Sequence, residues 1–281
     1  MPDRRAAPLG EDVRAAIGAA AARFGFSATP RLDAELLMAH ALGISREAMI
    51  LTRLGDPVPD GFAALVLRRE AHEPIAYLTG NRAFWTIELT VGPGVLVPRA
   101  DSETLIEAAV AHFAGRAGPA SVLDLGTGSG ALLLAALAEW PEARGIGLDA
   151  SEAAIAVARD NVRRLGMADR ARIETGGWDG MDGPHDLILC NPPYIATDAV
   201  LPLEVRVHEP ATALFAGDDG LDDYRRIAQV LRPQIAPAAV ACIEIGSDQG
   251  DSASALFRAQ GMSVEVRQDL GGRDRCLVVT P

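Results

Sequence analysis

The stretch Ser121-Val-Leu-Asp-Leu-Gly126-Thr-Gly128-Ser-Gly130 decides the fold, because a run of strand formers enters a glycine-rich turn before an apolar helix expected over 131–140. Glycine lets the backbone approach a ligand closely, and the free N–H groups at the start of the helix can face that ligand. A second apolar segment ends at Asp149, 19 residues beyond Gly130, where a carboxylate can accept hydrogen bonds from both hydroxyls of a ribose. The sequence therefore predicts a nucleoside-binding turn.

Strand-like and helix-like segments alternate around this turn, which predicts a mostly parallel sheet covered by helices on both faces. Ser151 is the expected N-cap of a helix over 151–165, and an earlier helix is expected from Asp101 to Gly115. The last two strands are too close for a helical crossover, so they are expected to pair as a hairpin, with one antiparallel strand at the sheet edge. Seven strands are predicted, at 121–125, 144–148, 171–174, 186–190, 239–245, 263–268 and 275–280.

The residues before this alternation predict helices and then a hairpin. Thr29-Pro30 is a typical helix start and Gly43 a typical stop, and a second helix is expected between Gly61 and Pro74. Strand formers over 84–91, the turn Gly92-Pro93-Gly94 and the run 95–97 predict a β-hairpin. We therefore expect an α/β chain in three parts: an all-helical domain over 1–78, a β-hairpin linker over 79–98 and a Rossmann-like domain over 99–281.

The glycine-rich turn alone does not distinguish a nicotinamide cofactor from S-adenosyl-L-methionine, because Gly126, Gly128 and Ala131 also fit the dinucleotide pattern. Two details favour S-adenosyl-L-methionine. Asp124 precedes the turn, where its carboxylate could reach a cationic methionine amino group, and Gly130 follows Ser129 as a third position of close approach. The further candidates for cofactor binding are Thr127 inside the turn and Trp178, which could cover an adenine face.

A second motif, Asn191-Pro192-Pro193-Tyr194, ends the strand expected over 186–190 and should lie beside the glycine-rich turn. The Asn191 side-chain oxygen and a carbonyl of the Pro-Pro unit can each accept one N–H from a planar –NH₂ group, which orients its nitrogen. Proline has no N–H and a fixed φ, so these carbonyls are held with little entropy to lose. Tyr194 could stack on the planar group. The four residues are the candidate catalytic and substrate-binding residues.

Composition excludes several classes of function. The sequence contains no Lys, and all 26 basic residues are Arg, so neither a P-loop lysine nor a lysine Schiff base can form. The net charge of −12 does not imply a broad surface for nucleic-acid phosphates. No apolar run reaches the roughly 18 residues that span a bilayer, and Met1–Gly10 lack a signal-peptide core, so a cytoplasmic location is expected. The scattered cysteines Cys190, Cys242 and Cys276 indicate buried thiols, not a metal site.

With these motifs in view, the chain resembles the release factor glutamine methyltransferases over nearly its whole length. The segments that carry the resemblance are 73–80 (Glu-Pro-Ile-Ala-Tyr-Leu-Thr-Gly), Phe84, 95–99 (Val-Leu-Val-Pro-Arg), 124–130, 191–194, Glu209-Pro210 with Ala213-Leu214, 219–221 and 272–275. The resemblance implies methylation, with S-adenosyl-L-methionine, of the glutamine in the Gly-Gly-Gln motif of class I peptide chain release factors. It also implies a helical N-terminal domain, expected to dock the substrate protein, and a seven-stranded methyltransferase domain, with no membrane or direct nucleic-acid partner. Carried over by position, the cofactor contacts are 126–130, Asp149, Trp178 and Asn191, and the substrate contacts are 191–194.

The sequence departs from the family pattern at Ala100 and Ser102, where Pro and Thr are common, and at Gly177, where an acidic residue is common. The loss of that acid would leave the adenine site dependent on Asp149 and Trp178. Three other functions are compatible with parts of the sequence: methylation of an exocyclic adenine amine in DNA or RNA, a methyltransferase-like scaffold without turnover, and a nicotinamide enzyme. A flipped adenine presents the same –NH₂ geometry, but the acidic charge and the lack of a separate target-recognition domain weigh against it.

Overall fold

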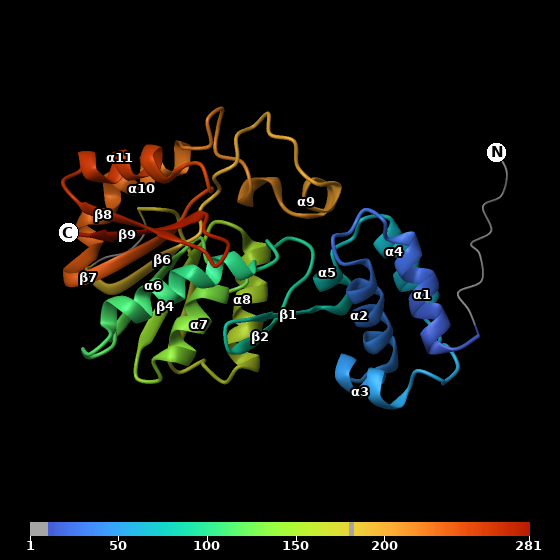
Figure 1. The fold of residues 1–281 in the computed structure, drawn as a ribbon. Coiled ribbons are helices and arrows are strands. Elements are labelled where there is room, and N and C mark those ends of the chain that lie inside the picture. Colours follow the sequence, from blue (N-terminus) through green and yellow to red (C-terminus); the bar gives the residue numbers. More distant parts are fainter. Residues whose placement is uncertain (1–10, 180–182) are drawn as a thin grey trace. The chain divides into compact units, whose positions relative to one another are not determined.

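The computed structural model describes residues 11–179 and 183–281, which form two compact units (Figure 1). The smaller unit contains the described residues up to Gly80 together with Pro202–His208, and the larger contains Asn81–Leu201 and Glu209–Pro281. Met1–Gly10, on which the expectation about export depends, lie outside the described residues. In the ranges described, no helix has both the length and the apolar character needed to cross a bilayer.

The smaller unit is all-helical. The helix α2 begins at Pro30 and ends before Gly43, which adopts the left-handed conformation at φ 66°, so the predicted start and stop are confirmed. A core of apolar side chains that includes Phe24, Leu37 and Phe62 lies between the helices. Its helices are α1 (Val13–Arg23), α2 (Pro30–Leu42), α3 (Arg46–Thr52), α4 (Phe62–Glu70), α5 (Ile75–Thr79) and α9 (Leu203–His208).

Arg69 holds this helical unit together from the inside. Only 3% of the residue is exposed, and its Nε and Nη2 donate to Oδ2 of Asp33 at 3.0 and 2.8 Å. Its Nη1 donates to Oε2 of Glu204 at 2.7 Å. One buried guanidinium therefore ties α2 and α4 to α9, a segment that is far away in the sequence.

The larger unit is built on a seven-stranded sheet, which confirms the predicted fold class. The strand order is β5-β4-β3-β6-β7-β9-β8. The chain order reverses between β3 and β6, so the carboxyl ends of these two strands form the switch point at which open α/β sheets bind ligands. The strands are β3 (Ser121–Leu125), β4 (Arg144–Asp149), β5 (Ala171–Thr175), β6 (His185–Cys190), β7 (Ile235–Glu244), β8 (Ser263–Gln268) and β9 (Asp274–Thr280).

Helices cover both faces of the sheet, as predicted (Figure 1). The helices α6 and α7 pack on one face, and α10 and α11 on the other, where Tyr224, Ile227 and Phe257 are fully buried against the strands. The hydroxyl of Ser151 accepts from Ala154 N at 3.3 Å, which confirms the predicted N-cap of α8. The helices are α6 (Glu103–Phe113), α7 (Ala131–Glu139), α8 (Glu152–Arg164), α10 (Asp222–Leu231) and α11 (Gly250–Ala259), with 3₁₀ turns at Ala100–Ser102, Ala211–Ala213 and Arg232–Gln234.

The predicted hairpin of the last two strands is present, but its placement in the sheet was predicted wrongly. The antiparallel strand β9 lies inside the sheet, between β7 and β8, and β8 is the edge strand. The burial of the two strands shows why: Cys276, Leu277 and Val279 of β9 are fully buried, whereas β8 is largely exposed. A continuous apolar run belongs in a sheet interior, and an alternating polar strand suits an edge.

The hairpin between the helical segment and the sheet exists, but its turn lies at Trp85 and Thr86 and not at the predicted Gly92-Pro93-Gly94. Its strands are β1 (Asn81–Phe84) and β2 (Ile87–Thr90), and Trp85 has a φ of 54°, which suits a two-residue hairpin turn. Asn161 of α8 binds both backbone groups of Thr90, accepting from its N–H at 2.7 Å and donating to its carbonyl at 2.9 Å. The hairpin therefore packs as part of the larger unit.

Candidate active site

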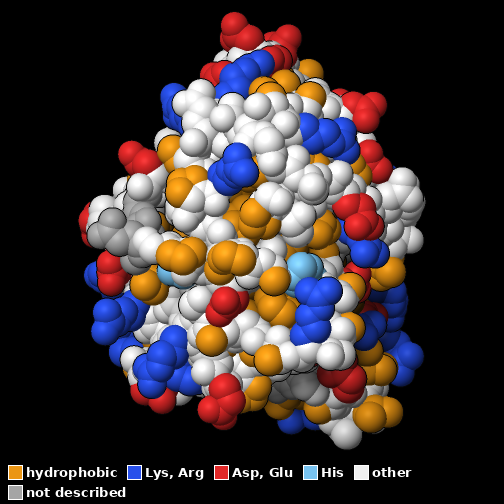
Figure 2. Space-filling model, turned by 90° about the vertical axis from the view of Figure 1, so that its left-hand side faces the viewer, with side chains coloured by type: hydrophobic (Ala, Val, Ile, Leu, Met, Phe, Trp, Pro, Cys, Tyr) orange, Lys and Arg blue, Asp and Glu red, His pale blue; other side chains and the backbone are white. Residues whose placement is uncertain are grey.

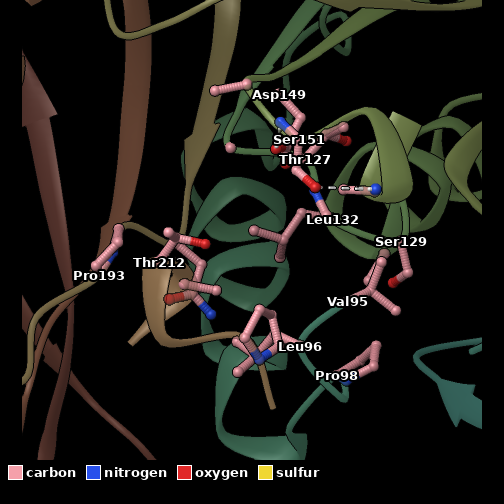
Figure 3. Close-up of a pocket in the computed structure, with 18 of the residues that line it drawn as sticks. Val95, Leu96, Pro98, Thr127, Ser129, Leu132, Asp149, Ser151, Pro193 and Thr212 are labelled. Atoms are coloured by element: carbon pink, nitrogen blue, oxygen red, sulfur yellow. Dashed lines mark hydrogen bonds between the residues drawn. The ribbon is translucent and has the colours of Figure 1, made fainter. Parts of the chain in front are cut away.

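A cavity of about 510 Å³ lies at the switch point of the sheet, where β3, β4 and β6 end. Figure 3 shows the turn after β3 and the residues around Asp149 on one side, Pro193 and Thr212 on another, and Leu96 and Pro98 below them. Both sequence motifs therefore contribute to one site. The predicted site residues that line the cavity are Gly126, Thr127, Gly128, Ser129, Asp149, Trp178, Asn191 and Pro193.

Gly126 has no side chain, which lets the ring of Trp178 pack closely against the glycine-rich turn. Its φ of +69° is strained for other residues, and a Cβ atom there would lie 3.1 Å from the ring of Trp178. Trp178 itself is fixed, since its indole Nε1 donates to Oδ1 of the buried Asp223 at 2.9 Å. A flat ring that lines the cavity is thus held in place beside the turn, and a ring of this kind can cover a planar nucleobase.

Asp149 is positioned by the backbone of both neighbouring loops. Its Oδ2 accepts from Gly128 N at 2.9 Å, and its Oδ1 accepts from Ser151 N at 2.8 Å. Each carboxylate oxygen has further acceptor capacity, and the residue lines the cavity. The carboxylate is therefore oriented in advance and can accept hydrogen bonds from ligand hydroxyls.

Asp124 occupies a different position from the one expected of a residue that meets a methionine amino group. It is 1% exposed and does not line the cavity. Its Oδ2 accepts from the Thr127 hydroxyl at 2.6 Å and from Leu133 N at 3.2 Å. Asp124 therefore connects the end of β3 to the turn and to the first turn of α7, and it shapes the site from behind.

The burial of Asp124 has a consequence for pH dependence. Burial is the largest cause that raises the pKa of its carboxyl to about 7, against an ordinary value of 3.8. Between pH 4 and pH 7, roughly, the native state holds a proton on Asp124 that the unfolded state has released. Protonation of Asp124 therefore stabilises the fold at low pH, and its contribution to the free energy of unfolding falls as pH rises from about 4 to about 7. We expect Asp124→Asn to reduce this downward trend, as measured by urea unfolding across that range. An identical pH trend in variant and wild type would contradict the assignment.

The Asn191-Pro192-Pro193-Tyr194 loop follows β6 directly. Asn191 and Pro193 line the cavity, whereas Pro192 and Tyr194 do not. The phenol of Tyr194 donates to Oε1 of the buried Glu244 at 3.1 Å, and its carbonyl accepts from Gln249 Nε2 at 3.0 Å. Burial raises the pKa of Tyr194 well above its usual range. The tyrosine, expected to stack on a planar substrate, is thus engaged in anchoring the loop to β7.

Two walls of the cavity were not among the predicted site residues. One is formed by Leu96 and Pro98, from the chain after the hairpin, and the other by Pro210, Thr212 and Ala213. Both walls come from segments that carry the family resemblance, and this resemblance is the sequence signal that could have identified them as site residues. Glu209 joins them: the buried carboxylate pairs with Arg99 and accepts from Val97 N at 3.3 Å.

Comparisons with known proteins agree with this architecture. A family model described as the PrmC N-terminal domain matches residues 15–80, and one described as the Methyltransferase small domain matches residues 101–208. The chain is 42% identical to the release factor glutamine methyltransferase of Rhodospirillum rubrum, over 89% of this chain and 78% of that protein. It is 39% identical to the enzyme of that name from Caulobacter vibrioides, over 89% of both chains. Among solved structures, a methyltransferase from Pyrococcus furiosus shares the fold, with a TM-score of 0.53 and 16% identity, covering 77% of this chain and 95% of that one.

Proposed function

We propose a residue-level account of catalysis on one premise: this chain belongs to the release factor glutamine methyltransferase family. It is an S-adenosyl-L-methionine-dependent methyltransferase. It methylates the side-chain amide nitrogen of a glutamine in a peptide chain release factor, the activity for which its relatives are named. That glutamine is the one in the Gly-Gly-Gln motif. Methylation of an adenine amine is not favoured.

The cavity fits the cofactor. Asp149 would accept from the ribose hydroxyls through the acceptor capacity that Gly128 N and Ser151 N leave open. Trp178, which packs against Gly126 and is held by Asp223, would cover the adenine. When bound, the cofactor supplies an electrophilic methyl group.

The chain's own residues orient the glutamine. The Asn191 side-chain oxygen accepts one amide N–H, and a carbonyl of the Pro192-Pro193 unit accepts the other. Two acceptors on one –NH₂ group fix its direction, which lowers the entropy cost of transfer. They also make the nitrogen lone pair available. No general base is required, because the nitrogen can release its proton after transfer. The observation that carries the proposal is that Asn191 and the glycine-rich turn line one cavity.

The direct test is mass spectrometry of a purified release factor after incubation with the enzyme and S-adenosyl-L-methionine. We expect one added methyl group on the glutamine of its Gly-Gly-Gln motif. A matched incubation with an adenine-containing oligonucleotide should show no methylation. Methyl transfer to the oligonucleotide, with none to the factor, would overturn the proposal.

Charge supports a protein substrate over a nucleic acid. The chain has a net charge of −12, and on the face drawn in Figure 2 the basic and acidic side chains are interspersed. A nucleic-acid surface generally gathers basic side chains on one face. A substrate that acts in translation also implies a cytoplasmic enzyme.

Asp149→Ala is expected to weaken cofactor binding by about 1–3 kcal/mol, the scale of charge-assisted hydrogen bonds, or about 5- to 150-fold in Kd. Titration calorimetry with S-adenosyl-L-methionine measures the change. Asp160→Ala is the matched control, because Asp160 lies in α8 with 44% of its side chain exposed and pairs with Arg163 away from the cavity. Equal affinities for the Asp149 variant and the control would contradict the assignment.

We also propose that the helical domain predicted over 1–78 docks the release factor and that the domain predicted over 99–281 carries out methyl transfer, with the segment 79–98 between them in the sequence. The exposed leucines Leu51 and Leu67, with 82% and 54% of their surface accessible, are the kind of side chain that protein partners cover. Docking predicts a KM at least about tenfold lower for the whole factor than for a short peptide containing Gly-Gly-Gln, since a second contact adds affinity. Steady-state kinetics on both substrates tests this, and equal KM values would remove the docking role.

A further inference from the structure

We propose that Ser102 and Glu244 are positioning residues that turn the Asn191 amide so that its oxygen, and not its nitrogen, meets the substrate. The inference rests on the proposed role of Asn191 as an acceptor for the glutamine N–H. An asparagine amide has an acceptor end and a donor end of almost the same shape. Only one of its two orientations supports catalysis, so something in the fold must select it.

The contact that selects the orientation is made with Ser102, a nearly buried residue that also lines the cavity. Asn191 Nδ2 donates to the Ser102 hydroxyl oxygen at 3.3 Å. Ser102 is 3% exposed and ends the 3₁₀ turn before α6, so its position is set by packing and not by solvent. The donor end of the amide is thereby occupied, and the acceptor end, Oδ1, remains for the substrate.

Glu244 determines which way the Ser102 hydroxyl points. This residue ends β7, is 1% exposed, and accepts from the Tyr194 phenol at Oε1. Burial raises the pKa of the Glu244 carboxyl above its ordinary value, and the neighbouring Ser102 hydroxyl works against that rise. In the proposed arrangement the single hydroxyl proton of Ser102 is directed to Oε2 of Glu244, a buried oxygen with no hydrogen-bond partner of its own among the described residues, and the serine's lone pairs face Asn191.

The order of donors is therefore fixed from the buried end: the amide of Asn191 donates to Ser102, and Ser102 donates to Glu244. Reversing the Asn191 amide would place its oxygen against the lone pairs of the serine and leave its –NH₂ facing the substrate's own –NH₂. The charge of Arg275 partly opposes the burial that raises the pKa of Glu244. Tyr194 belongs to the same network, which explains why the last residue of the catalytic loop faces β7 and not the cavity.

The test is a double-mutant cycle on the full-length enzyme with a purified release factor as substrate. We expect Ser102→Ala to lower kcat about tenfold, the size of one hydrogen bond, with the KM for S-adenosyl-L-methionine unchanged. Ser102→Thr keeps the hydroxyl and should restore most of the activity. The double variant with Asn191→Ala should be no slower than Asn191→Ala alone, because Ser102 acts through the amide.

Two outcomes would overturn the inference: full activity of Ser102→Ala, or the same tenfold loss from Ser102→Ala in the presence and absence of the Asn191 side chain. If Ser102→Ala does not fold, Ser102→Cys, which is nearly isosteric but a weak acceptor, is expected to show the same loss. Glu244→Gln, which can donate as well as accept, should lower kcat non-additively with Ser102→Ala, whereas Glu265→Gln on the exposed edge strand is the matched control. Full activity of Asn191→Ala would instead reject the proposed function, so the two failures are distinguishable.

Discussion

Asn191→Ala is expected to lower kcat for methyl transfer to a release factor by about 10²–10³-fold, the loss typical of removing one preorganised polar contact from an active site. The side chain lines the cavity beside the glycine-rich turn, and it supplies one of the two acceptors proposed to orient the substrate amide. Without it, the amide nitrogen keeps one contact and loses its fixed direction. Cofactor affinity should change little, because Asp149 and Trp178 are untouched.

The measurement is single-turnover transfer of a labelled methyl group, together with calorimetry of S-adenosyl-L-methionine binding to the same preparation. Asn81→Ala is the matched control, since Asn81 lies in β1 and does not line the cavity. Asn191→Asp adds a finer comparison, because it keeps the shape but cannot donate to Ser102. Transfer by Asn191→Ala within threefold of the wild-type rate would refute the catalytic role.

Arg69→Met is expected to destabilise the helical unit by about 3–5 kcal/mol, the cost of leaving a buried charge without its partner. Asp33, only 5% exposed, would lose both guanidinium contacts, and Glu204 would lose its link to α4. Methionine fills a similar volume, so the effect would come from charge and not from a cavity. Because this arginine holds α9, the α9 backbone should also unfold locally more often.

Hydrogen exchange of the α2 and α9 amides, combined with thermal unfolding, measures this effect. The neighbouring Arg68→Met is the matched control: the Arg68 side chain is 52% exposed and pairs with Glu73 at the surface. An exposed pair of this kind contributes about 0–1 kcal/mol. Equal stability of the two variants would show that the buried ion pair is not needed for the helical unit.

Local signals in the sequence located the elements of the fold well. The strand before Gly126, the N-cap Ser151 and the helix between Pro30 and Gly43 each depend on residues close together in the chain. Hydrophobic periodicity, capping and glycine conformation are local properties, so they can be read from the sequence. The family resemblance, carried by short exact motifs, supplied the activity.

The placement of the last strands and the turn of the hairpin could not be located in this way. Whether β9 lies inside or at the edge of the sheet depends on which strand pairs with β7. Because α11 and β8 separate β7 from β9 in the chain, local sequence does not reveal this pairing. The turn at Trp85 likewise depends on Glu103, whose carboxylate accepts from Trp85 N at 2.9 Å. The predicted turn at Gly92-Pro93-Gly94 does form, with Val95 N donating to Gly92 O at 3.4 Å, but it follows the hairpin and contributes Gly94 to the wall of the cavity.

The sequence alone determined that a glycine-rich turn and an Asn-Pro-Pro-Tyr loop follow two strands of one parallel sheet, because strand direction brings their carboxyl ends to one edge. Only the tertiary structure decided which side chains of these motifs face the ligand. Asp124 and Tyr194 turn away from the cavity because buried partners, Thr127 and Glu244, satisfy their polar groups. A buried polar atom is placed by the hydrogen-bond partner that it finds, and the partner of Tyr194 lies 50 residues away in the chain, so local sequence does not reveal it.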